Sequence, residues 1–157
     1  MKPASLSDIK KEIAHLDPGE LAALCLRIAK YKKENKELLS YLLFELSDEN
    51  NFILGVKSET DLLFEEINYS NLYYAKKGIR KALRHVNKNI RYSGIAATQA
   101  ELLIYFCQKL KATGIHLEKS VSLNNIYLAQ LKKINKTIEG MHEDLQFDFK
   151  KELKALE

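Results

Sequence analysis

Apolar residues recur along this chain at steps of three and four positions, the spacing of one face of an α-helix. No stretch shows the alternation of apolar and polar residues that is typical of a half-buried strand. The fixed-period signatures of the common helical-repeat families are also missing from the sequence. We therefore expect an all-α fold, either a helical bundle or a short irregular α-solenoid, with about seven to eight helices. The apolar sets that carry this expectation follow Pro18 and then cover 38–46, 48–67, 72–90, 102–110, 127–138 and 145–156.

Short polar motifs predict where several helices begin and end. The motif Asp17–Glu20 combines a capping carboxylate, a proline suited to the first helical position and a glutamate that completes a capping box. Thr98 and Glu101 have the spacing of a second capping box. The stretch 48–67 fits one helix, or two helices that break near Gly55. Further breaks are expected at 68–71, 92–94, 113–114 and Gly140.

The length of 157 residues is that of one ordinary domain, so we expect a single all-helical domain over residues 1–157. Cys25 and Cys107 both stand among apolar residues, which favours buried thiols over a metal or redox site. The longest apolar run is the six residues Leu102–Cys107, whereas a membrane span needs about 20. The first residues do not have the pattern of a secretory signal. We therefore expect a cytoplasmic protein.

Positive charge is concentrated in the middle of the chain. The sequence as a whole carries a formal net charge of +4. Residues 69–138 contain 13 Lys and Arg against 2 Asp and Glu, a net charge of +11, and the segments before and after it are net acidic. Such an asymmetry points to an anionic partner, although it says nothing about the fold.

Seven of these basic residues lie between positions 76 and 91 without an intervening acid. At about 100° per residue they all fall within one arc of about 140° on a helix, and the apolar residues of the same stretch fall outside it. Tyr73 lies inside the basic arc, and Gly78 lies near the border of the apolar face, where a neighbouring segment can approach closely. We expect the apolar side to face the core and the basic side to meet an anionic partner. The predicted site consists of Lys76, Lys77, Arg80, Lys81, Arg84, Lys88, Arg91 and Tyr73.

The sequence leaves several explanations of this basic face open. It can be an ordinary solvated surface, or it can be covered by the C-terminal acids Asp144, Asp148 and Glu152, which share one helical face. An acidic protein surface and the phosphates of a nucleic acid are both suitable partners, the latter because tyrosines can stack on bases. A membrane surface fits poorly, because the apolar face lacks the Trp and Phe of inserting helices.

Candidate catalytic chemistry is sparse. The four histidines are far apart in sequence, and the trio His142–Asp144 is better explained as a solvated surface, because adjacent helical residues point in different directions. The common phosphate-binding, dinucleotide, zinc-protease and hydrolase motifs are missing from the sequence. We therefore expect a non-enzymatic helical scaffold or adaptor, without cofactor, metal or small-molecule substrate, that binds an acidic protein partner or self-associates. The alternative is a nucleic-acid-binding protein that uses the same basic helix.

Overall fold

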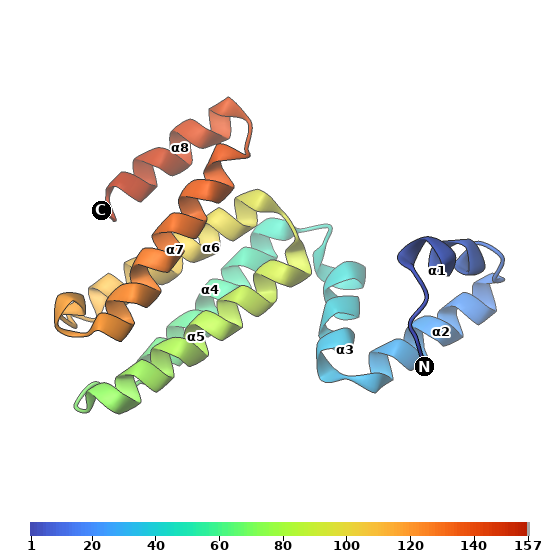
Figure 1. Cartoon of the computed structure of the whole chain (residues 1–157), viewed down its shortest axis with the longest axis horizontal. Helices are drawn as coiled ribbons and strands as arrows, with labels where there is room; N and C mark the ends of the chain where they lie inside the picture. Colours follow the sequence, from blue (N-terminus) through green and yellow to red (C-terminus); the bar gives the residue numbers. More distant parts are fainter. Residues whose placement is uncertain (157) are drawn as a thin grey trace. The chain divides into compact units, whose positions relative to one another are not determined.

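A computed structural model describes residues 1–156, and over these residues the chain forms α-helices and no strands (Figure 1). The chain is 80% helical, with eight α-helices in the described part. The predicted all-α class is therefore confirmed. The chain falls into two compact units, residues 1–44 (unit 1) and the residues from Glu45 on (unit 2), and each is described here by itself. The predicted single domain over 1–157 stays a prediction.

Unit 1 contains three helices, of which α2 and α3 pack against each other. The predicted capping box is confirmed: Asp17 Oδ1 accepts hydrogen bonds from the backbone N–H groups of Gly19 and Glu20, at 2.7 and 2.9 Å. Glu20 Oε2 accepts the backbone N–H of Asp17 in return, at 3.1 Å. The bounds are α1 (Leu6–Ile13), α2 (Pro18–Tyr31) and α3 (Lys33–Ser40), followed by the π-helical turn Tyr41–Glu45.

Unit 2 is a bundle of five helices. The stretch 48–67 forms one helix, with Asp48 as its N-cap, so the break considered near Gly55 is not present. The expected breaks at 92–94, 113–114 and Gly140 each coincide with the end of a helix. The bounds are α4 (Glu49–Glu65), α5 (Leu72–Ser93), α6 (Ala96–Ala112), α7 (Val121–Glu139) and α8 (Glu143–Lys154), with a 3-10 turn at Leu117–Lys119.

Helix α6 is the centre of this bundle and packs against α4, α5, α7 and α8. Its apolar residues lie all round the helix, which is the pattern of a helix buried on every side. Phe106 is fully buried, and its ring centroid lies 5.7 Å from that of Phe64 on α4. The buried residues of α6 are Thr98, Ala100, Leu102, Leu103, Ile104, Phe106, Cys107 and Leu110.

The predicted capping box at Thr98 and Glu101 is wrong. Helix α6 begins at Ala96, and its N-cap residue, Ile95, makes no side-chain cap. Thr98 is buried, and its hydroxyl donates to Glu49 Oε1 of α4 at 2.6 Å. Glu101 accepts a hydrogen bond from Lys57 at 2.6 Å. Both side chains therefore join α6 to α4, because the tertiary contact offers each of them a partner that a local cap would not use.

The two cysteines are free thiols in different surroundings. Cys107 is fully buried in α6, as predicted, and burial raises the pKa of its thiol to about 12. Cys25 is only half-buried in unit 1, so the prediction of a buried thiol fails there. Among residues 1–156, no helix combines the length and the apolar character that crossing a bilayer requires.

Candidate anion-binding surface

Helix α5 displays the predicted basic residues on one side and buries its apolar side. The helix starts after Asn71, whose side chain accepts the backbone N–H of Tyr73 at 2.8 Å. It ends at Gly94, whose φ of 67° needs a residue without a Cβ. The apolar stripe predicted from the sequence is in the core and comprises Ala75, Ile79, Ala82, Val86 and Ile90.

The eight predicted site residues differ in exposure. Tyr73 is 69% exposed, in agreement with its position on the basic arc. Lys76 and Lys88 are half-buried, and the Lys88 ammonium lies 6.0 Å from the centre of the Tyr92 ring. The fully exposed cations of the set are Lys77, Arg80, Lys81, Arg84 and Arg91.

The edge of α5 that faces α4 is electrostatically balanced. Lys81 pairs with Glu66 at 3.1 Å, and His85 lies 3.5 Å from Glu59. A groove of about 320 Å³ lies along this edge, and Glu66 is its only acidic lining residue in the described chain. The acids of α4 therefore compensate part of the basic helix, which the sequence analysis did not predict.

The opposite edge of α5 lies beside α7, which runs in the same direction (Figure 1). Near the start of both helices, Arg80 Nη2 donates to Ser122 Oγ at 2.8 Å. Further along, Lys133 Nζ donates to Asn87 Oδ1 at 2.8 Å. Two uncharged polar side chains thus hold one cation from each helix at this seam.

Helix α7 adds basic residues of its own to this seam. Lys132 and Lys136 are exposed, and Lys133 is half-buried between them. Burial, and then the nearby charge of Arg91, lower the pKa of Lys133. A second cation rather than a carboxylate is therefore the charged neighbour that acts on Lys133. We name the following set the α5–α7 basic surface: Arg80, Arg84, Arg91, Lys132, Lys133 and Lys136.

The sequence analysis missed the lysines of α7 as site residues. Their only signal was the net charge of +11 over residues 69–138, which includes them. That segment supplies two acids, Glu101 and Glu118, and Glu101 is bound to Lys57 at the other side of the bundle. The charge of this surface is thus not balanced from within α5–α7.

The C-terminal acids occupy a different part of the bundle. Helix α8 packs against α6 and α7, whereas α5 packs against α4 and α6. Asp148 and Glu152 line a groove of about 320 Å³ together with Lys57 of α4 and residues of α6. The arrangement goes against the alternative in which these acids fold back along the basic helix.

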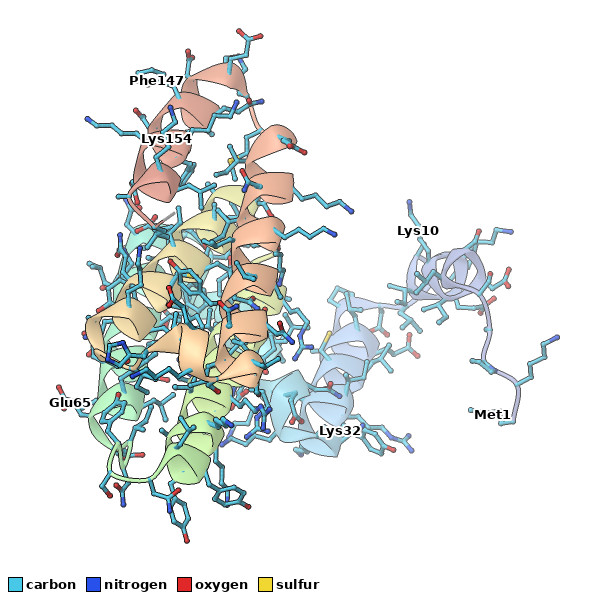
Figure 2. The ribbon with its side chains drawn as sticks, turned by 60° about the vertical axis from the view of Figure 1, so that its left-hand side comes forward. Met1, Lys10, Lys32, Glu65, Phe147 and Lys154 are labelled. Atoms are coloured by element: carbon cyan, nitrogen blue, oxygen red, sulfur yellow. The ribbon has the colours of Figure 1, made fainter. Side chains whose placement is uncertain are left out.

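The remaining side of α8 is basic. Phe147 and Lys154 project outward from this helix (Figure 2). They line a groove of about 440 Å³, together with Asn135 of α7, Lys150, Lys151 and Leu153. These lysines provide a second group of exposed cations, against which the α5–α7 basic surface can be tested.

The trio His142–Asp144 is a helix cap. The His142 ring nitrogen Nδ1 lies 3.4 Å from the backbone nitrogen of Asp144, and both side chains are largely exposed. Within residues 1–156, no cluster of three or more His, Cys, Asp or Glu side chains is arranged to hold a metal ion. The candidate site therefore rests on charge alone.

No protein-family model matches this sequence, and no curated protein and no solved structure matches it either.

Proposed function

We propose that the protein is a non-enzymatic helical adaptor, and that its α5–α7 basic surface binds an acidic surface of another protein. The observation that carries the proposal is the pair of Arg91 and Lys133, which two neighbouring helices hold close enough for one charge to act on the other. Like charges at such a distance repel each other. An acidic group from a partner relieves this repulsion, so binding gains free energy at this seam.

The dimensions of the surface support a helix-sized partner. Arg80 and Arg91 are eleven residues apart on α5, which corresponds to about 16 Å of helix. Packed helices lie about 8–10 Å apart, so α5 and α7 present two rows of cations at that separation. An acidic helix of about three turns, with carboxylates at four-residue spacing, covers an area of this size.

A nucleic acid is the second candidate, and exposed tyrosines at the start of α5 favour it. Tyr73 and Tyr74 are 69% and 54% exposed, and their ring centroids lie 5.4 Å apart in an edge-on arrangement. Aromatic rings beside cations are the combination that binds single strands, because bases stack on the rings while phosphates meet the charges. A protein partner remains our first choice, because exposed Tyr beside Arg is also the composition of protein-binding hot spots.

We place the protein in the cytoplasm. The support is that its two cysteines are unpaired, as is usual for proteins of a reducing compartment. An adaptor in that compartment meets both acidic proteins and nucleic acids, so the choice between the two candidates needs a direct binding experiment.

The experiment measures the fluorescence anisotropy of two labelled probes, a glutamate-rich helical peptide of 14 residues and a 20-nucleotide thymidine oligomer. The test variant carries Arg84→Glu, Lys132→Glu and Lys136→Glu, three exposed residues of the α5–α7 basic surface. The control variant carries Lys150→Glu, Lys151→Glu and Lys154→Glu on α8, so its net charge changes by the same amount. We expect the test variant to weaken peptide binding at least tenfold and the control variant less than twofold.

Two results would overturn the proposal. Equal losses in both variants would show that the peptide responds only to net charge. Tighter binding of the oligonucleotide than of the peptide, with a steep decrease between 50 and 200 mM salt and a loss on Tyr73→Ala, would select the nucleic-acid candidate instead.

A further inference from the structure

Helix α1 presents an apolar face that unit 1 does not bury. Leu6, Ile9 and Ile13 share one side of the helix, at the three- and seven-residue offsets of helices that dock into grooves. They are 85%, 42% and 38% exposed. The Ser5 side chain caps the helix, with its hydroxyl accepting the backbone N–H of Asp8 at 3.2 Å, so local sequence supports the helix without an apolar contact.

Unit 1 also contains an apolar groove, between α2 and α3. Its volume is about 180 Å³, below the roughly 300–1,000 Å³ of small-molecule sites. A groove of this size accepts a few side chains rather than a cofactor. It is lined by Cys25, Ile28, Ala29, Asn35, Leu38, Leu39 and Leu42. The Asn35 amide donates to the backbone oxygen of Ile28 at 2.9 Å, so the one polar lining residue is already satisfied.

Unit 1 is too small to be stable with these surfaces in water. It has 44 residues, and as the structure describes α1, α2 and α3, no residue of these helices is buried. Chains near 40 residues usually need disulfides, metals or oligomerisation to fold, and the Cys25 thiol is free. A partner that covers the apolar residues is therefore required.

We propose that this partner is a second copy of the chain, and that α1 of each copy occupies the α2–α3 groove of the other. One chain supplies both the amphipathic helix and the groove, so the exchange is reciprocal. A two-fold interface of this kind satisfies both copies at once and forms a closed dimer.

The short connection between α1 and α2 argues against docking within one copy. Only four residues, 14–17, separate the two helices, which limits their reach to about 14 Å. Ile13 therefore stays near the capped start of α2. The groove begins at Cys25, about 10 Å further along that helix. The α1 helix of a second copy is free of this restriction.

Charge and area are both compatible with the dimer. The last turn of α1 carries Lys10 and Lys11, and the first turn of α3 carries the exposed acid Glu34. Lys10 projects away from the α1 ribbon (Figure 2), where it can meet such an acid. The exposed apolar residues of unit 1, at roughly 50–100 Å² each, offer about 500–1,000 Å² per copy, comparable with the roughly 800 Å² that each partner buries in a standard interface. They are Leu6, Ile9, Ile13, Leu21, Leu26, Ile28, Tyr31, Leu38, Leu42, Leu43 and Phe44.

The native thiol of Cys25 in the groove allows a direct test on the full chain. Leu6→Cys, Ile9→Cys and Ile13→Cys each place a second thiol on the docking face of α1, and Lys11→Cys places it on the opposite face as a matched control. After mild oxidation, we expect disulfide-linked dimers from at least one of the three variants and not from the control. Adding Cys25→Ser should abolish them, since Cys107 is fully buried.

A second measurement covers the case in which the cysteine variants are poorly folded. Sedimentation of the unmodified chain, whose mass is 18.1 kDa, should give a dimer that dissociates on dilution. Leu38→Lys in the groove should shift it to monomer, and Lys36→Ala on the same helix should not. A monomer at 100 μM overturns the proposal, and so does a disulfide formed only within single chains, which mixing isotope-labelled and unlabelled protein would reveal.

Discussion

The two helical units of this protein are equally well specified as helices, yet only unit 2 has a core. In unit 1, α2 has a complete capping box and no buried residue. In unit 2, α6 has no side-chain cap and eight buried residues. Local signals therefore determine where a helix starts, but burial against other helices determines whether it is held in place, because short helices are marginal in water by themselves.

The polar contacts of the two units differ in the same way. Unit 2 joins α4 to α6 through Asp61, which accepts hydrogen bonds from Tyr105 and pairs with Lys109 at 2.8 Å. The ion pair printed on α3 of unit 1, between Lys33 and Glu37, joins neighbouring turns of one helix, and Lys33 is 85% exposed. Such a pair contributes about 0.3–0.5 kcal/mol at most. Four substitutions test this contrast.

The largest difference is expected for apolar truncation. Phe106→Ala removes a fully buried ring from unit 2 and should cost about 3–5 kcal/mol of unfolding free energy, because a cavity remains. Leu26→Ala removes a side chain of unit 1 that is 56% exposed and should change the main transition by less than about 0.5 kcal/mol. Urea unfolding followed by circular dichroism measures both. Similar losses would mean that the units share one core.

A smaller effect is expected for the polar contact of unit 2. Burial opposes ionisation of Asp61, but the hydrogen bonds from Lys109 and Tyr105 and the charge of Lys109 outweigh it and hold the pKa of Asp61 below its usual value. Asp61→Asn should therefore cost about 1 kcal/mol at pH 7. Since the folded pKa is the lower one, this contribution is complete above about pH 5 and is lost as the pH falls below about 4. Urea unfolding at pH 7 and pH 3 should show the two proteins converge at low pH, and a constant difference would contradict this account.

Two glycines in unit 2 separate close packing from helix propensity. A Cβ on Gly78 would lie 2.6 Å from Ile67 Cγ1, which confirms the close approach expected from its position on α5. Gly78→Ala should destabilise unit 2 by about 1 kcal/mol despite the better helix propensity of alanine. Gly55→Ala, where no atom lies within 4 Å, should instead stabilise it by about 0.5–1 kcal/mol. Thermal unfolding of the two variants should therefore shift in opposite directions.

The smallest effect on the main transition is expected from the cap of α2. Asp17→Ala removes both hydrogen bonds to the first turn and should weaken that helix by about 1 kcal/mol. Because the loss is confined to unit 1, the helical signal should decrease slightly while the unfolding midpoint of unit 2 stays unchanged. Asp17→Asn is the control that keeps a capping oxygen. A shift of the main midpoint would show that the two units unfold together.

The sequence was most informative about features that depend on near neighbours. The Asp17 cap, the single face of cations on α5 and the end of that helix at Gly94 were all predicted, because each depends on residues within a few positions. The spacing of Thr98 and Glu101 was misread, because both side chains have partners on α4, more than forty positions away in the sequence. Local spacing alone contains no information about such partners.

The candidate surface shows the same limit. The pattern of α5 placed its basic residues on one side, whereas Lys132, Lys133 and Lys136 belong to the surface only because α7 lies beside α5. The acids Asp148 and Glu152 were considered as a cover for the basic helix, and they lie instead with Lys57 of α4. How charges on different helices combine depends on which helices are neighbours.

The sequence by itself determined that this protein is all-α, where most of its helices start and end, and which side of α5 is apolar, because helical periodicity and capping act over a few residues. The tertiary structure decided that α6 is the central helix, that α5 and α7 join their cations into one surface, and that the helices of unit 1 bury none of their described residues. Those outcomes depend on contacts between residues far apart in the chain, and the free energy that selects them is the burial of apolar surface between helices.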